Sequence, residues 1–190
     1  CNPMLGENRP GSIGLPLPDV DCRIVSMADG QTPLVVGQAG ELLIRGPQVM
    51  QRYHNQPAET AAALVDGWLH TGDIARMDAD GYFYLVGRKK ELIKVSGYQV
   101  WPAEVESVII AHPAVKEVGV AGVPDEARGE AVKAWVVLHP GQLATADEIR
   151  QWCLDQLAHY KAPREIVFVS ALPRTTVGKL LRRELINLTV

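Results

Sequence analysis

Short apolar runs separated by turn-forming residues make up the first half of the chain. Three of these runs have the apolar content of β-strands, at residues 21–25, 40–45 and 81–86. Three Asp-Gly pairs predict tight turns, at residues 29–30, 66–67 and 80–81, because glycine tolerates positive φ and aspartate bonds nearby backbone. Residues 57–64 predict a short helix with Pro57 near its start. We therefore expect residues 1–87 to form a small β-rich unit.

A different pattern begins after the charged residues 88–91. The predicted elements are a hairpin of residues 92–95 and 98–100, a helix over 102–111, paired strands over 115–123 and 131–138, a helix following Thr145, and a basic helix over 180–188. Thr145 and Glu148 fit a capping box, and the apolar residues from Ile149 to Leu157 recur at helical spacing, which predicts a face in the core. Residues 92–190 are thus predicted to be α+β, with a small antiparallel or mixed sheet and flanking helices.

Composition narrows the classes of function. A net charge of -3 leaves no basic excess for binding nucleic acid. Three widely separated cysteines without a CxxC pair, and five histidines without an HExxH motif, predict no disulfide framework and no metal site. No apolar run approaches the ~18 residues that a membrane-spanning helix needs. The chain opens on Cys1 without an initiator Met, and we expect a piece of a longer protein from a reducing compartment.

Asp73 and Arg88 are the first candidates for chemistry. Asp73 follows His-Thr-Gly, where we expect an apolar strand to end and lead into a loop. A carboxylate there can accept two hydrogen bonds from a vicinal diol, and such charge-assisted bonds are strong. The alternative is an aspartate that only closes a turn or caps a helix. Arg88 lies fifteen positions later, across the predicted strand 81–86, so both side chains can converge on one ligand. His70 is interpreted as a structural imidazole.

Two glycines accompany further candidates. Gly97 in the predicted hairpin supplies positive φ, and its missing Cβ also lets a narrow substrate arm pass close to the backbone. Lys179 follows Gly178 in a predicted loop before the basic helix. This is not a phosphate-binding GxxxxGK[ST] loop, because Pro173 stands where the first glycine is required and Leu180 follows the lysine.

Three motifs give the chain a family resemblance. They are GWLHTGDIA at 67–75, GRKKELIKVSGYQVWPAEVE at 87–106 and PRTTVGKLLRREL at 173–185. In this order they resemble the last three core motifs of the adenylate-forming enzymes, which include acyl-CoA synthetases, luciferases and the adenylation domains of peptide synthetases. The resemblance spans nearly the whole chain. It implies that residues 1–87 are the distorted-barrel end of a truncated AMP-binding domain, residues 88–91 a hinge, and residues 92–190 a mobile C-terminal lid domain.

The resemblance implies a nucleotide-binding role for Asp73, Arg88, Lys90 and Gln99. Asp73 matches the family's ribose-binding aspartate, and Arg88 matches the arginine that also reaches the ribose. Many relatives carry Asp where this chain has Gly87, which puts help from a neighbouring carboxylate in doubt. Lys90 matches the position about which the lid pivots and, in the CoA-ligase branch, a nucleotide contact. Without the motif, adjacent lysines in a linker would be read as solvated charges.

The resemblance also implies two catalytic surfaces on the lid. Lys94 and Gln99 match a Lys and a Gln that approach the acyl-adenylate as CoA attacks, and Ser96 and Gly97 match positions along the pantetheine path. Lys179 matches the lysine that bridges the carboxylate and the α-phosphate during adenylation. A fixed ammonium suits this step, because a carboxylate attacking a polyphosphate brings anions together. The lid is expected to rotate so that each surface serves one half-reaction.

Within the family, the chain looks most like bacterial long-chain fatty acid–CoA ligases. The segment GELLIRGPQVMQRYHNQPAET at 40–60 and the three motifs favour this branch, and Lys90 rather than Asp at the pivot leans the same way. Aryl or medium-chain acids are alternatives, as are an adenylation domain of a peptide synthetase and a non-catalytic module that binds adenylate or CoA. The motifs do not distinguish a luciferase-type oxidation.

The expected cofactors are ATP/AMP, CoA and Mg²⁺, and the expected partners are small molecules: a carboxylic acid, ATP and CoA. In the family, the phosphate loop and the acyl pocket lie upstream of the matched motifs. We therefore expect Mg²⁺ and the triphosphate to be held mainly by that part, and this chain alone to be inactive. We expect a cytoplasmic protein without nucleic-acid partners or a transmembrane segment; peripheral contact with the inner membrane and the oligomeric state are left open.

Overall fold

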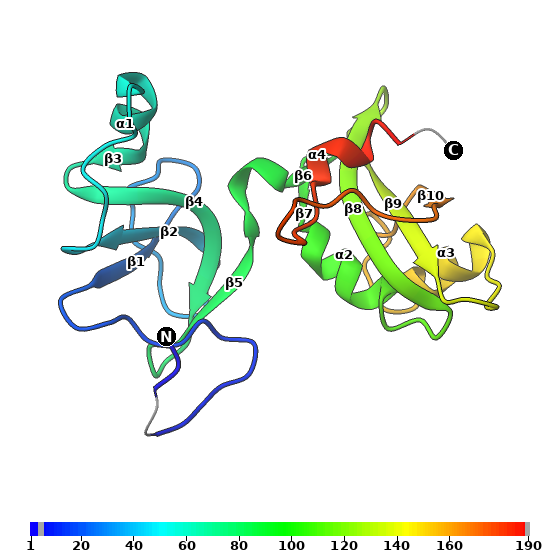
Figure 1. Cartoon of the computed structure of the whole chain (residues 1–190), viewed down its shortest axis with the longest axis horizontal. Helices are drawn as coiled ribbons and strands as arrows, with labels where there is room; N and C mark the ends of the chain where they lie inside the picture. The colour runs from blue at the N-terminus through cyan, green and yellow to red at the C-terminus, as the bar shows by residue number, and fades with distance from the viewer. Residues whose placement is uncertain (4–5, 189–190) are drawn as a thin grey trace. The chain divides into compact units, whose positions relative to one another are not determined.

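A computed structural model describes residues 1–3 and 6–188 of the chain. These residues form two compact units, Cys1–Lys90 (unit 1) and Glu91–Val190 (unit 2), whose elements are drawn in Figure 1. The division falls inside the charged segment 88–91, where a short 3₁₀ helix spans Lys89–Glu91. No helix in the described ranges is long and apolar enough to cross a bilayer.

Unit 1 is built around one antiparallel sheet with a single short helix beside it. Its elements are β1 (Asp21–Val25), β2 (Gly40–Arg45), α1 (Pro57–Ala63), β3 (Leu64–Val65), β4 (Trp68–Met77) and β5 (Phe83–Arg88). The ranges predicted for β1 and β2 are confirmed to the residue. β5 begins two residues later than predicted, because Gly81 has φ +85° and belongs to the turn that the Asp78 carboxylate closes by accepting from the Tyr82 amide.

Strand β4 is longer than the sequence pattern predicted and connects the sheet of unit 1. It pairs with β2 along one edge and with β3 and β5 along the other, which gives the sheet its curl. The prediction that Asp73 lies where a strand ends in a loop is wrong, because Asp73 lies inside β4. The physical reason is Gly72, whose φ of +69° allows a bulge in the strand, after which β4 pairs with β5 from Asp73 and again with β2 from Ile74.

The sheet of unit 1 carries buried apolar side chains on both of its faces. Alternate residues of β1 and β2 point to opposite faces. Two separate clusters result: Ile24, Leu42, Ala75 and Phe83 form one, and Val25, Leu43 and Trp68 form the other. The strands that carry the candidate site are therefore held in a rigid, two-sided layer.

Unit 2 combines a mixed sheet with helices. Its elements are β6 (Ile93–Val95), β7 (Tyr98–Val100), α2 (Pro102–Ile109), β8 (Val115–Asp125), β9 (Gly129–Leu138), α3 (Ala146–Leu154), β10 (Glu165–Phe168) and α4 (Arg182–Leu185). β9 pairs antiparallel with β8 and β6, and parallel with β10. Together the two units confirm the predicted α+β class.

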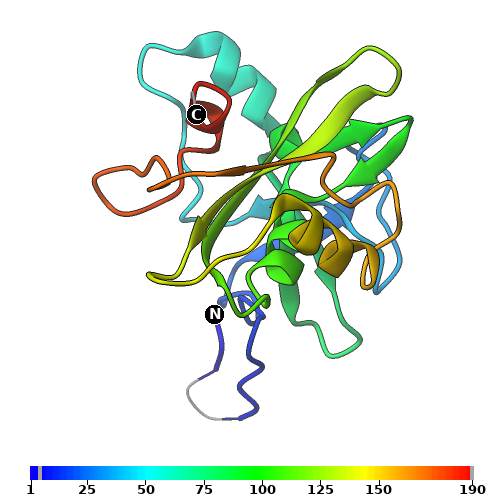
Figure 2. The same ribbon diagram turned by 90° about the vertical axis from the view of Figure 1, so that its right-hand side faces the viewer.

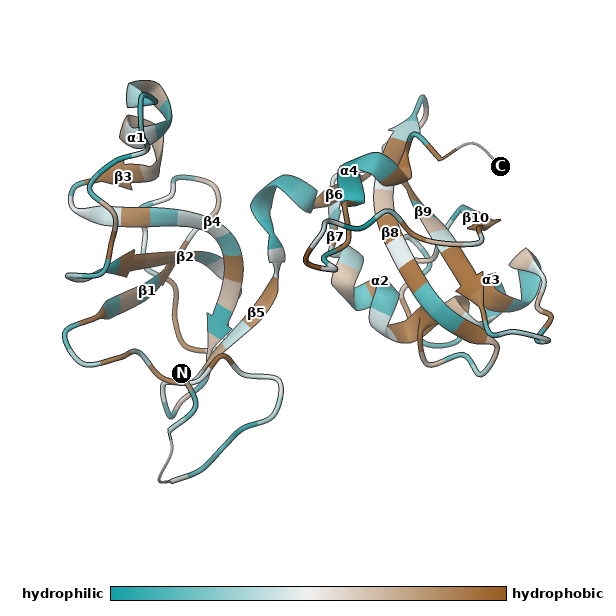
Figure 3. Cartoon of the chain, viewed as in Figure 1, coloured by the Kyte–Doolittle hydropathy of each residue, from teal (hydrophilic) through white to brown (hydrophobic). Residues whose placement is uncertain are grey.

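The long β8–β9 hairpin separates two parts of the core in unit 2. On one face, α2 and α3 pack against Val120, Val132 and Val136 (Figure 2). On the other face, Leu185 of α4 packs with Ala121, Trp135 and Val137. The hydropathy colours agree with this arrangement, since apolar residues, drawn in brown, are frequent along β8 and β9 (Figure 3). One strand pair thus supports helices on both of its faces.

The end of the chain departs from the prediction. A helix was expected over residues 180–188, but α4 is restricted to Arg182–Leu185. Leu180 instead pairs with Arg174 in a β-bridge, and the Leu181 amide donates to the Pro173 carbonyl at 2.9 Å. The predicted capping box at Thr145 and Glu148 is confirmed. The predicted core stripe holds at Ile149 and Cys153, which are buried, and Leu157 packs against the same cluster although it lies beyond the end of α3.

Candidate functional site

Asp73 and Arg88 lie opposite each other on neighbouring strands. The register of β4 against β5 pairs the two residues, and Arg88 Nε lies 3.0 Å from Asp73 Oδ1. The Arg88 side chain is 56% exposed and that of Asp73 is 28% exposed, so a ligand can reach both. Sequence reasoning expected the two side chains to converge, and the pairing shows how: they are cross-strand neighbours at the edge of one sheet.

The backbone before Asp73 is held by Thr71. Thr71 Oγ1 donates to the Leu42 carbonyl at 2.8 Å and accepts from the Asp73 amide at 3.0 Å. With Gly72 at positive φ between them, these bonds fix the bend in β4. The direction of the Asp73 carboxylate therefore follows from local hydrogen bonding and does not depend on a ligand.

Sequence reasoning missed Glu41, the one buried charged residue in the described ranges. Its side chain is 3% exposed, and Oε2 accepts from Lys89 Nζ at 2.7 Å. Oε1 accepts from the Gly72 amide at 3.3 Å, and His70 Nδ1 lies 3.6 Å from Oε2. An acid inside the apolar run Gly-Glu-Leu-Leu-Ile was the available signal, because a buried carboxylate requires partners.

The surroundings of Glu41 lower its pKa. Burial alone raises the pKa of this carboxyl, but the Lys89 ammonium, His70 and the Gly72 amide outweigh that effect, so the net shift is below the ordinary value of 4.5. Glu41 is therefore the charged anchor that holds Lys89, and Lys89 lies between Arg88 and Lys90. The imidazole of His70 belongs to this structural group, as the sequence interpretation expected.

A small hollow lies beside these residues. It is lined by Thr71, Gly72, Arg88, Lys89 and Lys90. Lys90 is exposed, and its ammonium forms no ion pair with any residue of 1–3 or 6–188. The three cationic side chains around this hollow suit an anionic or hydroxyl-bearing ligand. The hollow and the Asp73–Arg88 pair together form the candidate site of unit 1.

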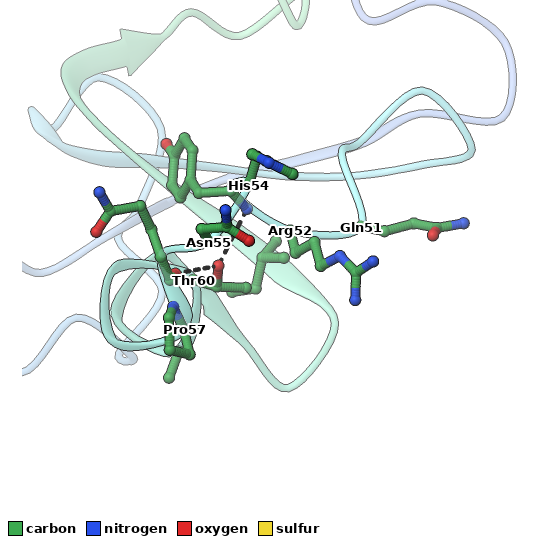
Figure 4. Close-up of a pocket in the computed structure, with 10 residues that line it drawn as sticks. Gln51, Arg52, His54, Asn55, Pro57 and Thr60 are labelled. Carbon is green, nitrogen blue, oxygen red and sulfur yellow. Dashed lines mark hydrogen bonds between the residues drawn. The ribbon is translucent and has the colours of Figure 1, made fainter.

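A second hollow in unit 1 contains none of the predicted site residues. It lies between the loop 51–56 and α1 (Figure 4). Thr60 Oγ1 accepts from the Tyr53 amide at 3.0 Å and donates to the Gln56 carbonyl at 2.6 Å, which closes the loop onto the helix. Its polar contacts are thus explained by the local fold.

In unit 2, the β6–β7 hairpin presents four of the predicted residues. Lys94 and Gln99 are paired across the hairpin, and the turn consists of Ser96 (φ +49°) and Gly97 (φ +84°). All four are exposed, and a Cβ added at Gly97 would meet no atom within 4 Å. The turn therefore has the form that a two-residue hairpin requires, and its outer side is open.

Lys179 lies in an ordered loop. The Thr175 amide donates to the Lys179 carbonyl at 2.8 Å, and the Lys179 amide donates to Thr175 Oγ1 at 3.1 Å. Gly178 has φ +82°, which a side chain would disfavour. The Lys179 side chain is exposed and makes no ion pair within the described ranges. A firmly held backbone thus carries a free ammonium.

The two candidate lysines of unit 2, Lys94 and Lys179, are attached to opposite ends of β8. The Lys94 amide donates to Glu130 Oε2 at 2.6 Å, and Glu130 pairs with Pro124 near the end of β8. Arg174, at the base of the Lys179 loop, donates to Glu117 near the start of β8. An extended strand covers about 23 Å over the seven residue-to-residue steps from Glu117 to Pro124. Lys94 and Lys179 therefore serve separate surfaces of unit 2.

The described residues offer no ready place for a metal ion. No group of three or more His, Cys, Asp and Glu side chains comes together within residues 1–3 and 6–188. The Asp73 carboxylate is already paired with Arg88, and Glu41 is buried against Lys89. The donor set therefore fits phosphate and hydroxyl groups better than it fits Mg²⁺.

Family models match the chain in two places. Residues 104–179 match the AMP-binding enzyme C-terminal domain, and residues 1–54 match the AMP-binding enzyme family. The two matches fall on either side of the segment that joins unit 1 to unit 2.

Curated relatives match nearly all of the chain. A long-chain-fatty-acid–CoA ligase of Bacillus subtilis (strain 168) is 48% identical over 98% of this chain and 33% of its own length. A luciferin 4-monooxygenase of Photinus pyralis is 43% identical over 95% of this chain and 33% of its own length. The chain thus spans about a third of the length of the curated relatives that it matches.

Solved structures share the fold at similar identity. An ATP-bound MatB from Rhodopseudomonas palustris superimposes with a TM-score of 0.93 at 36% identity, covering 97% of this chain and 37% of that protein. An O-succinylbenzoate coenzyme A synthetase (MenE) from Bacillus subtilis, in complex with ATP and magnesium ion, superimposes with a TM-score of 0.83 at 39% identity. That alignment covers 92% of this chain and 35% of the synthetase.

The buried Glu41 predicts a specific acid dependence of stability. Because its folded-state pKa lies below the ordinary 4.5, the charged carboxylate stabilises the folded chain above about pH 4.5. That contribution is lost as the pH falls through the lower folded-state pKa. Glu41→Gln should therefore lower the free energy of unfolding at pH 7, and the difference from the unsubstituted chain should shrink in acid. Urea unfolding between pH 7 and pH 3 measures this; a constant difference across that range contradicts it.

Proposed function

We propose that this chain, which belongs to the adenylate-forming AMP-binding enzymes, carries the ribose-binding edge and the lid of an ATP-dependent acyl-CoA synthetase. In the first half-reaction, a carboxylic acid attacks the α-phosphate of ATP and gives an acyl-adenylate and pyrophosphate. In the second, the CoA thiol attacks the acyl carbon and releases AMP. The observation that carries the proposal is the Asp73–Arg88 pair immediately before Lys89 and Lys90.

The site of unit 1 suits the nucleoside part of ATP and AMP. The Asp73 carboxylate would accept from the two ribose hydroxyls, and the exposed guanidinium of Arg88 would lie beside the same sugar. Because Arg88 already neutralises Asp73, the helping carboxylate that many relatives place at position 87 is not needed to hold the arginine. Lys90, exposed at the edge of the same hollow, would contact the nucleotide and serve as the pivot of the lid.

Lys179 is proposed as the catalytic cation of adenylation. The reacting carboxylate and the α-phosphate are both anions, so their approach requires a fixed positive charge between them. Lys179 meets this requirement, since its loop is ordered by Thr175 while its ammonium is free. The separate position of Lys94 at the far end of β8 supports a second surface that is used in the other half-reaction.

The hairpin of β6 and β7 is proposed as that second surface. The open outer side of Ser96 and Gly97 would admit the narrow pantetheine arm of CoA, and Lys94 and Gln99 would lie beside the acyl-adenylate. A rotation of unit 2 about Lys90 would exchange this hairpin for the Lys179 loop. Such a movement is a gating step of the lid type.

The proposed acid is a long-chain fatty acid, and the proposed cofactors are ATP, CoA and Mg²⁺. The similarity to a long-chain-fatty-acid–CoA ligase favours this substrate. A luciferin 4-monooxygenase is also similar over nearly the whole chain, so relatives with other reactions share this region. An aryl-CoA ligase, a peptide-synthetase adenylation domain and a non-catalytic adenylate- or CoA-binding module are the alternatives. Release of AMP across a series of acids and thiols would separate them.

The described residues include no phosphate loop, and we propose that the 190-residue chain alone catalyses neither half-reaction. The triphosphate and Mg²⁺ would be held by another part of the complete enzyme. ATP–pyrophosphate exchange by the isolated chain, above the background without protein, would contradict this.

Lys179→Ala should separate the two half-reactions in the complete enzyme. We expect ATP–pyrophosphate exchange to fall by about 10²- to 10³-fold, because one preorganised charge at the transition state is lost. Transfer of a supplied acyl-adenylate to CoA should stay close to the unsubstituted rate. Lys116→Ala removes another exposed lysine of unit 2 and serves as the control. Equal losses in both steps would defeat the assignment.

Gly97→Leu should obstruct only the second half-reaction. A leucine side chain at the open turn would stand in the pantetheine path, and adenylation should be unaffected. Gly141→Leu is the matched control, since Gly141 also has positive φ (+78°) and open space around it, so that both variants carry similar backbone strain. If both variants show the same KM for CoA, the hairpin is not on the thiol path.

A further inference from the structure

Arg182 is the most highly connected side chain near the Lys179 loop. It begins α4, three residues after Lys179, and its side chain is 18% exposed. Its guanidinium forms a fork to the Glu106 carboxylate of α2 and donates through Nη1 to the Val120 carbonyl of β8 at 2.6 Å. Its Nε lies 3.1 Å from Glu91 Oε2. One side chain thus joins four separate parts of unit 2.

The contact with Glu91 links distant parts of the chain. Glu91 is the first residue of unit 2 and directly follows Lys90, the proposed pivot. Arg182 and Glu91 are 91 positions apart in the sequence, yet their side chains are hydrogen-bonded. The segment after Lys179 is therefore connected to the residue after the pivot by one ion pair as well as by the long covalent path.

A second arginine holds the other end of the loop. Arg174 Nη1 donates to the Gly178 carbonyl at 2.7 Å, and Nη2 donates to Glu117 at 2.6 Å. Arg174 is more exposed than Arg182, with 45% of its side chain accessible. Exposed ion pairs contribute little to stability, whereas the shielded contacts of Arg182 with several partners fix the position of its side chain. Arg182 is therefore the stronger of the two attachments.

We propose that Arg182 is a positioning residue that fixes the Lys179 loop relative to the pivot, an inference that rests on the proposed function of Lys179. When unit 2 turns about Lys90 as one rigid body, the ion pair between Glu91 and Arg182 keeps the loop in a fixed position within that body. The ammonium of Lys179 then arrives at the reaction centre in a defined place. Lysine cannot replace Arg182, because an ammonium cannot satisfy the planar fork to Glu106 and the bond to Glu91 together.

A spin label on the loop tests the positioning directly in the 190-residue chain. Val177→Cys places the label at an exposed position two residues before Lys179; Cys1→Ser and Cys22→Ser remove competing thiols, and Cys153 is buried. We expect Arg182→Gln to narrow the nitroxide spectrum, because the loop loses its attachment. Arg183→Gln is the matched control, since the neighbouring Arg183 is 82% exposed and, among the residues that the structure describes, forms an ion pair only with Glu184. It should leave the spectrum unchanged.

A reference label separates local loosening from unfolding. Leu143→Cys carries a label on another exposed loop of unit 2, and Arg182→Gln should not alter its spectrum. If Arg182→Gln does not fold, Arg182→Lys keeps a positive charge beside Glu106 and still removes the fork. An unchanged Val177 label in a folded Arg182 variant overturns the inference.

Rates of the two half-reactions in the complete enzyme distinguish a role of Arg182 in positioning Lys179 from a role in stabilising the fold. We expect Arg182→Lys to lower adenylation by about 10- to 100-fold, the cost of a small misplacement of a reacting group, while transfer from a supplied acyl-adenylate to CoA is retained. Equal losses in both steps would mean a structural role only and would overturn the inference. If Lys179→Ala leaves adenylation intact, the proposed function fails instead, and the label experiment still reports whether Arg182 holds the loop.

Discussion

The register of β4 against β5 is the constraint on which the candidate site depends. It places Asp73 opposite Arg88, and because Arg88 is the last residue of β5, it also fixes where the joining segment begins. The next residue, Lys89, is held by the buried carboxylate of Glu41 on β2. A shift of this register by one residue would turn the Asp73 side chain to the other face and detach the start of the joining segment from the site.

Electrostatics explains why the proposed enzyme needs a mobile part. A lysine placed between the carboxylate and the α-phosphate in the first step would stand in the way of a thiol that must reach the acyl carbon in the second. Unit 2 offers a solution, because Lys179 and Lys94 are attached to opposite ends of β8 within one packed body. A rigid body with two cationic surfaces can serve two steps in turn, provided that each loop keeps its place while the body rotates.

Patterns of neighbouring residues in the sequence predicted local structure well, but they did not predict contacts between residues that are distant in the sequence. The strands β1 and β2, the hairpin turn at Gly97 and the capping box at Thr145 depend on neighbours in the sequence, and each was predictable. Asp73 was placed in a loop because Thr-Gly resembles a strand end, but β4 only bulges at Gly72 and then pairs with β2 and β5 beyond it. The attachment of Glu41 to Lys89 depends on a contact over 48 positions, which no periodicity reveals.

The same reason accounts for the helix that was predicted too long. The leucines of residues 180–188 follow a helical spacing, but Leu180 is drawn into a bridge with Arg174, and Leu185 packs against β8 and β9. The types and the order of the candidate residues were visible in the sequence, whereas Arg182 became notable only through its contacts.

The most direct test of the proposed rotation of unit 2 is the distance between spin labels at Leu85→Cys and Val177→Cys in the complete enzyme. Rotation of unit 2 about Lys90 predicts two different distance distributions, one with ATP and an unreactive acid analogue and one with an acyl-adenylate analogue and CoA. A single unchanged distribution under both conditions would contradict it.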